Sequence, residues 1–139
     1  MKKYIDSNVF IYAVLYEDAR ALACRQILTH IVAGDFDAVT SVLTWDEFTY
    51  VLARNLGQAT AALQGERFLR FPGLTFEPCT PAILAAAQEI YLSTSLRPRD
   101  AIHIATARHV SAHAVVSEDS DFDGHADLPR ECPSEGADG

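Results

Sequence analysis

The sequence predicts an α/β fold of three layers, α/β/α, with a central parallel sheet of four or five strands. Short apolar segments alternate with longer segments of helical periodicity, which is the pattern of a parallel sheet covered by helices on both faces. The chain of 139 residues suits one domain that buries roughly two thirds of its unfolded surface. It contains no internal repeat and no linker that would divide it.

The first half of the chain is expected to form two short strands and four helices. Apolar residues recur at helical spacing in the segment 19–33, and Gly34, Gly57 and Pro72-Gly73 stand where helices end. The strands are expected at 2–6 and 38–41, and the helices at 9–16, 19–33, 44–56 and 58–71.

The second half continues the alternation. Strands are expected at 74–77 and 114–116, and Phe122 begins a short fifth strand. Thr80-Pro81 places a capping residue before a proline, which predicts a helix that runs through Ile90, and a further helix is expected at 100–112. We expect the domain to occupy residues 1–130. A disordered acidic tail is expected at 131–139, where proline and glycine are frequent and apolar residues almost absent.

Four acidic residues occupy segments that this fold can bring to one edge of its sheet. Asp6 ends the first strand and Asp119 follows the strand at 114–116, so both lie where ligands bind in open α/β sheets. Glu47 and Asp100 stand at the starts of helices. Clustered carboxylates repel one another, and a divalent cation removes that conflict. An oxygen-only ligand set selects Mg²⁺ (or Mn²⁺), which favours hydrolysis of phosphodiester bonds.

Each of these acids also has a local explanation that the residues leave open. Asp6 can cap backbone amides in a turn. Glu47 can form a capping box with Thr44, three residues before it. Asp100 can serve as the N-cap of the helix at 100–112.

The histidines are interpreted as structural. His109 and His113 have a spacing that can bind zinc, but no Glu follows His109 as a metalloprotease motif requires, so a solvated helical face is favoured. His103, one turn after Asp100, is expected to be a packed residue near the site rather than a general base.

Four blocks of sequence surround the acids in order: MKKYIDSNVFIYA, TWDEF, RPRDAIHIATA and VVSEDSDF. In this order and at these separations they resemble the PIN domain family, especially the VapC-type toxin ribonucleases. The resemblance extends over about residues 1–123, nearly the whole chain.

The resemblance implies a metal site made by the four acids Asp6, Glu47, Asp100 and Asp119. The family pattern of Ser or Thr, any residue and Asp favours Asp119, and Asp121 competes with it because it precedes Phe122 as in the family's Asp-Phe ending. Ser117 is expected to orient the pocket. Asn8 either supports the site or caps the first helix.

The resemblance also implies a function and partners. The chain would be a metal-dependent endoribonuclease and the toxin of a type II toxin-antitoxin pair. It would act as a homodimer, and a small antitoxin protein would inhibit it by inserting a peptide into the acidic pocket. A non-toxin PIN ribonuclease in RNA processing and a catalytically silent PIN-like scaffold are the alternatives.

The net charge of −8 belongs mainly to the end of the chain. Residues 118–139 hold eight acids and one base, whereas residues 1–117 hold eleven acids and ten bases. A nearly neutral body does not favour nucleic-acid binding, because phosphate contacts come from Lys and Arg. Bound divalent cations would reverse the local field of the carboxylates, and six arginines could supply further contacts. These are Arg54, Arg67, Arg70, Arg97, Arg99 and Arg108.

Composition also indicates the compartment. Three scattered cysteines without a Cys-x-x-Cys pair suggest a reducing environment. No apolar run of about 18 residues could span a membrane, and Asp6 interrupts the start too early for a signal peptide. We expect a cytoplasmic protein without membrane contact.

Overall fold

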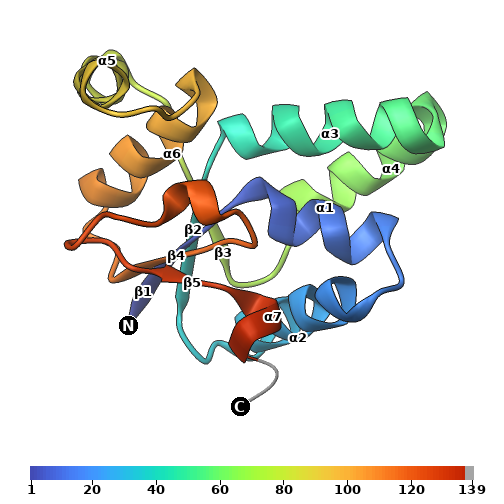
Figure 1. Cartoon of the computed structure of the whole chain (residues 1–139). Helices are drawn as coiled ribbons and strands as arrows, with labels where there is room; N and C mark the ends of the chain where they lie inside the picture. The colour runs from blue at the N-terminus through green and yellow to red at the C-terminus, as the bar shows by residue number, and fades with distance from the viewer. Residues whose placement is uncertain (137–139) are drawn as a thin grey trace.

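The computed structural model describes residues 1–136, in which five parallel strands form one sheet between helices (Figure 1). This confirms the predicted three-layer α/β fold. The strand order is β3-β2-β1-β4-β5. The strands are β1 (Lys2–Ile5), β2 (Asp37–Ser41), β3 (Leu74–Glu77), β4 (Ala114–Val116) and β5 (Arg130–Glu131). The helices are α1 (Ser7–Leu15), α2 (Ala19–Ala33), α3 (Leu43–Leu56), α4 (Gln58–Leu69), α5 (Pro81–Ser93), α6 (Pro98–His109) and α7 (Pro133–Gly136).

The centre of the sheet positions the end of β1 beside the end of β4. Tyr4 pairs with Val115 and Ile5 with Val116, and the Asp6 backbone N–H donates to the Val116 carbonyl at 3.0 Å. The chain proceeds from β1 to β2 and β3 on one side and returns to β4 on the other. Crevices form where the strand order reverses in this way, so polar residues that follow β1 and β4 meet at one edge.

Side chains of the central strands alternate between two hydrophobic cores. Tyr4 and Val115 pack with α5 and α6 on one face, whereas Ile5 and Val116 pack on the other face with α1 to α4. Figure 1 shows α5 and α6 on one side of the strands and α1 and α2 on the other. All four strand residues are at most 1% exposed, as expected for a parallel sheet that is covered twice.

Local signals in the sequence start and end several of these helices. The Asp18 side chain accepts from Ala21 N–H at the start of α2, and Gly34 ends this helix in the left-handed conformation with φ 76°. The Thr80 hydroxyl accepts from Ile83 N–H at 3.2 Å before α5, as the Thr80-Pro81 pair predicts. Gly73 has φ 79°, and a Cβ built there would lie 2.5 Å from the Ile31 carbonyl oxygen.

The fifth strand differs from the prediction. Residues Ser120–Phe122 form a 3₁₀ turn rather than a strand, because the Asp119 carboxylate accepts from Asp121 N–H at 2.9 Å and turns the chain. Phe122 is then buried in the core beneath α5 and α6. Arg130–Glu131 takes the place of the edge strand, with Ser117 N–H donating to the Glu131 carbonyl at 3.0 Å.

The boundary expected at residue 130 therefore falls inside β5. Residues 131–136, which we expected to be disordered, include part of β5 and all of α7. The Glu118 carboxylate holds this segment, because it accepts from the Ser134 backbone N–H at 3.0 Å and the Ser134 hydroxyl at 2.8 Å. The rest of the expected tail, 137–139, lies outside the described residues. None of the helices within residues 1–136 has the length and apolar character that a membrane crossing requires.

Candidate metal centre

All four predicted acids line one pocket of about 600 Å³ at the carboxyl edge of the sheet. Asp6 follows β1, Glu47 lies in the second turn of α3, Asp100 lies in the first turn of α6, and Asp119 follows β4. Segments that are distant in sequence thus contribute one carboxylate each. The rim adds Arg97 and Arg99 from the start of α6, and Tyr12 and Tyr16 from α1 and its end.

Asp6 is held in place by hydrogen bonds to both carboxylate oxygens. Its Oδ1 accepts from the Ser7 backbone N–H at 2.7 Å, and its Oδ2 accepts from the Ser117 hydroxyl at 2.7 Å. The residue is only 4% exposed. Asp6 thus caps α1, as its local explanation requires, but it also lies on the pocket, so the two interpretations are compatible.

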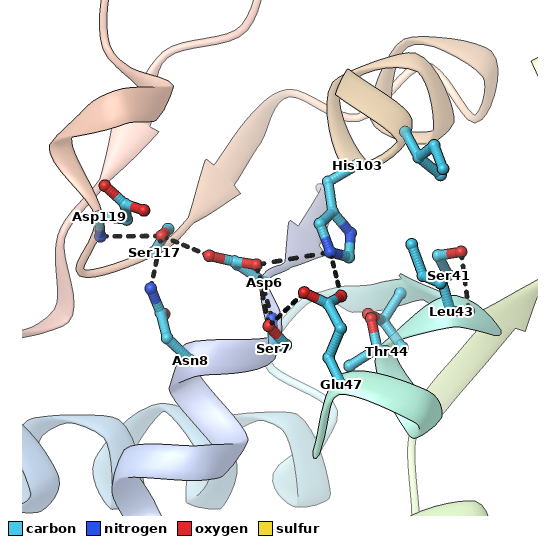
Figure 2. Close-up of polar contacts among 12 residues, drawn as sticks. Asp6, Ser7, Asn8, Ser41, Leu43, Thr44, Glu47, His103, Ser117 and Asp119 are labelled. Carbon is cyan, nitrogen blue, oxygen red and sulfur yellow. Dashed lines mark hydrogen bonds and ion pairs between the residues drawn. The ribbon is translucent and has the colours of Figure 1, made fainter. Parts of the chain in front are cut away.

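Ser117 connects β1 and β4 at this edge (Figure 2). Its hydroxyl donates to Asp6 and accepts from the Asn8 side-chain amide at 3.0 Å and from Asp119 N–H at 2.9 Å. The Asn8 carbonyl oxygen in turn accepts from Glu118 N–H at 3.3 Å. Asn8 therefore braces the loop after β4 and does not cap α1.

Glu47 is bound by side chains rather than by its own helix. Its Oε1 lies 2.5 Å from His103 Nε2, and its Oε2 lies 3.4 Å from the Ser7 hydroxyl (Figure 2). The capping box with Thr44 does not form. Because α3 begins at Leu43, one residue before the predicted start, Thr44 lies inside the helix and its hydroxyl pairs with that of Thr40 at 2.7 Å.

Asp100, Asp119 and Asp121 form a compact group of carboxylates, which does not include Asp6 or Glu47. Each offers a carboxylate oxygen, and these three oxygens lie within 4.8 Å of one another. Asp100 is not an N-cap, because Arg97 occupies that position and Pro98 begins the helix. Among the described residues, no Lys or Arg forms an ion pair with any of the three.

The electrostatics of the pocket oppose full ionisation of the metal-free protein. Burial raises the pKa of Asp100 to about 6, and the negative charges of Asp6, Asp119 and Glu47 add to this effect. Burial also raises the pKa of Asp6, although His103 and the Ser117 hydroxyl partly compensate. For His103, burial alone lowers the pKa, but the hydrogen bond to Glu47 and the surrounding carboxylates outweigh it and raise the pKa.

These residues fit a hard divalent cation. The donor set consists of carboxylate oxygens, and no cysteine or histidine belongs to the group of three within the part of the chain that is described. Such oxygen sets suit Mg²⁺ and Mn²⁺, and the cation would offset both the burial and the like charges that raise the pKa of Asp100.

The other histidines lie apart from this centre. His109, at the end of α6, is exposed, with Nε2 3.6 Å from Glu77 Oε1. His113 is also exposed but lies beyond the helix, because α6 ends three residues before the predicted limit and Ser111 reverses the chain with φ 57°. The exposure of both side chains is consistent with the interpretation that they face solvent.

The sequence alone did not reveal how His103 is connected. It was expected to be packed near the site, and it is 0% exposed, but its contacts with Tyr4 on β1 and Glu47 on α3 cross three elements. The one available signal was its position three residues after Asp100, which places both side chains on one face of α6.

Comparison with protein families matches residues 3–128 to the PIN domain. No curated protein sequence matches the chain. Solved structures resemble it, among them the Mycobacterium tuberculosis toxin VapC20, which cleaves the sarcin-ricin loop. The TM-score is 0.73 at 18% identity, over 86% of this chain and 92% of that one.

Two complexes are also similar. VapBC2 from Rickettsia felis, bound to a DNA fragment from its promoter, has a TM-score of 0.74 at 14% identity, over 95% of this chain and 98% of that one. A toxin-antitoxin complex from Klebsiella pneumoniae has a TM-score of 0.69 at 17% identity, over 94% of this chain and 97% of that one. At these identities the likeness establishes the fold.

Proposed function

Because the chain belongs to the PIN domain family, we propose that it is a metal-dependent endoribonuclease that hydrolyses RNA phosphodiester bonds. The observation that carries this proposal is the convergence of Asp6, Glu47, Asp100 and Asp119 on one pocket, from four separate segments. Burial and the neighbouring carboxylates together raise the pKa of Asp100 to about 6, and a bound cation would favour its ionised form at neutral pH.

Asp100 and Asp119 would hold Mg²⁺ or Mn²⁺, together with Asp6 and Glu47, and Asp121 is a further candidate. The cation would supply a bound water of lowered pKa and stabilise charge on the phosphoryl oxygens. The Ser117 hydroxyl holds Asp6 next to the loop that carries Asp119, because it donates to the Asp6 carboxylate and accepts from Asp119 N–H. Arg97 and Arg99 lie on the same rim and would bind the phosphates on either side of the scissile bond.

The proposed biological role is that of a toxin in a type II toxin-antitoxin pair. Structures of similar fold are toxins or toxin-antitoxin complexes, which supports an antitoxin protein as partner. A homodimer and a cytoplasmic location belong to the same proposal, and the free thiols of Cys24, Cys79 and Cys132 suit a reducing compartment.

The experiment is RNA cleavage by purified protein with Mg²⁺, with Mn²⁺ and with chelator. Wild type should cleave only with metal, and Asp100→Asn should lose activity at least about 100-fold, since it removes a metal ligand. Asp37→Asn is the matched control, because it removes an exposed carboxylate at the opposite end of β2. Full activity of Asp100→Asn, or cleavage in chelator, would refute the assignment.

The toxin role has a separate test. Induced expression should arrest growth, and co-expression of a short neighbouring gene that encodes a DNA-binding antitoxin should restore it. A ribonuclease that cleaves RNA without arresting growth would favour RNA processing. A protein that binds neither metal nor RNA would favour the scaffold.

A further inference from the structure

A buried hydrogen-bonded chain leads from the backbone of β2 to the carboxylate of Glu47. Ser41 N–H donates to the Tyr4 hydroxyl at 3.2 Å, this hydroxyl lies 2.5 Å from His103 Nδ1, and His103 Nε2 lies 2.5 Å from Glu47 Oε1. Tyr4 and His103 are each 0% exposed, and the Glu47 side chain is 14% exposed. The chain thus ends at the pocket and is otherwise sealed from water.

The donors and acceptors along this chain place a proton on His103 Nε2. Ser41 N–H occupies one acceptor site of the Tyr4 oxygen, so the tyrosine O–H is free to donate to Nδ1. A neutral imidazole that accepts at Nδ1 carries its proton on Nε2, where it donates to Glu47. A doubly protonated ring would also donate from Nε2, so the direction of this bond is the same in either state.

The same nitrogen also lies close to the second acid of the pocket. His103 Nε2 is 3.8 Å from Asp6 Oδ1, so it stands between Asp6 and Glu47 (Figure 2). Because both ring nitrogens are engaged and the ring is fully buried, His103 cannot contact a substrate. Its effect must pass through Glu47.

We infer that His103, fixed by the Tyr4 hydroxyl, is a positioning residue that sets the orientation of Glu47 towards the bound cation. This inference rests on the proposed metal-dependent function, which it deepens. The two hydrogen bonds of His103 join three elements, since Tyr4 belongs to β1, Glu47 to α3 and His103 to α6. A single donor thereby fixes Glu47 relative to the β1 edge that carries Asp6.

The protonation of the ring can be measured without any metal or substrate. In ¹⁵N-labelled protein, histidine nitrogen chemical shifts distinguish a protonated nitrogen from a bare one. We expect His103 Nε2 to be protonated in wild type and its hydrogen to exchange slowly. In Tyr4→Phe, which removes only the hydroxyl, Nδ1 loses its donor, so the chemical shift of Nδ1 should change while Nε2 stays protonated through its bond to Glu47. A wild-type ring with bare Nε2 would overturn the inference.

Three variants then separate positioning from packing, with isothermal titration of Mn²⁺ into the metal-free protein as readout. His103→Leu removes the donor, and we expect Mn²⁺ to bind roughly 10- to 100-fold more weakly. His103→Gln keeps an N–H donor within reach of Glu47 and should retain most of the affinity. Thr106→Val is a buried change one turn along α6, and among residues 1–136 the Thr106 hydroxyl bonds only to the Ile102 carbonyl, so this variant should leave binding unchanged.

Thermal unfolding of each variant controls for loss of fold, and RNA cleavage is measured on the same samples. Equal Mn²⁺ affinity of the Leu and Gln variants would overturn the positioning role, whether both match wild type or both are weakened. If wild type itself neither binds Mn²⁺ nor cleaves RNA, the proposed function fails. The nitrogen shifts of His103 still report in that case whether the bond to Glu47 exists.

Discussion

The carboxylate of Asp100 has an environment unlike that of an ordinary surface acid. It is partly buried, it faces Asp6, Asp119 and Glu47, and no arginine or lysine among the described residues neutralises it. Burial and like charges raise its pKa from 3.8 to about 6. The folded, metal-free protein therefore binds more protons than the unfolded chain between these two values.

This environment predicts a pH-dependent stability. The stabilising contribution of protonated Asp100 to the free energy of unfolding is fully present below its ordinary pKa of 3.8 and is lost as pH rises through about 6. In chelator at pH 7.5, Asp100→Asn should therefore be more stable than wild type by about 1–3 kcal/mol, measured by urea unfolding. The difference should vanish near pH 4. A variant that is less stable than wild type at pH 7.5 would contradict the claim that burial and like charges destabilise ionised Asp100.

Substitutions of Asp119 and of Asp121 should reduce cleavage activity to different extents. Asp119 lines the pocket and its backbone bonds to Ser117, whereas Asp121 is exposed and adds one oxygen to the same group. Asp119→Asn should reduce Mg²⁺-dependent cleavage more than Asp121→Asn, by a further factor of about 10. The comparison is made at saturating Mg²⁺. Equal losses would assign both carboxylates to the ion, and a larger loss for Asp121→Asn would reverse the assignment.

Site residues could be located from the sequence to the extent that each belongs to a strand end or a helix start. Asp6 and Asp119 follow apolar strands, and parallel strands bring their carboxyl ends to one edge. The bonds of Glu47 could not be predicted, because a local rule assigned it to Thr44 whereas its actual partner, His103, is 56 residues away. Long-range pairs of this kind carry no local sequence signal.

At the level of elements, the apolar segments and their end signals determine most of the fold. The helix α2 and the strands β3 and β4 have the predicted bounds, since apolar periodicity and Gly34 mark them clearly. The strand β5 could not be predicted. It has two residues, both charged, and exists because the carbonyls of Pro129 and Glu131 accept hydrogen bonds from Val115 N–H and Ser117 N–H.

Gly73 joins α4 to β3 and offers a test of how closely the layers approach. Gly73→Ala should destabilise the protein by about 2–4 kcal/mol, because a Cβ would lie 2.5 Å from the Ile31 carbonyl oxygen. Gly34→Ala is the matched control: its φ of 76° is similar to 79° at Gly73, but its Cβ would contact nothing within 4 Å. Urea unfolding should show the smaller loss for Gly34→Ala. Equal losses would mean that backbone strain alone is responsible.

The N-terminal turn of α6 brings two arginines to the acidic pocket. Arg99 lies 3.7 Å from Asp46 with more than half of its side chain exposed, and Arg97 lines the pocket beside it. We expect Arg97→Ala to raise KM for RNA roughly 5- to 10-fold with little change in kcat, since a phosphate contact adds binding without acting on the reacting bond. The loss should shrink at high salt. A fall in kcat at constant KM would place Arg97 in the chemistry.

At the scale of the whole molecule, charge is distributed unevenly. The acids that line the pocket come from all parts of the chain, whereas most of the net charge of −8 lies beyond residue 117. The segment after that residue folds back through β5 and α7, and α7 lies beside α2 in Figure 1. Because four carboxylates line the pocket, we expect RNA binding to require the divalent cation.

The central claim is that carboxylates from distant segments share one hard cation. The most direct measurement is a crystal structure of the protein grown with Mn²⁺, with anomalous scattering recorded to locate the metal. We expect an anomalous peak in the pocket, within about 2.0–2.3 Å of oxygens from Asp100 and Asp119, and with Asp6 and Glu47 around it. A pocket without such a peak at saturating Mn²⁺ would contradict the account.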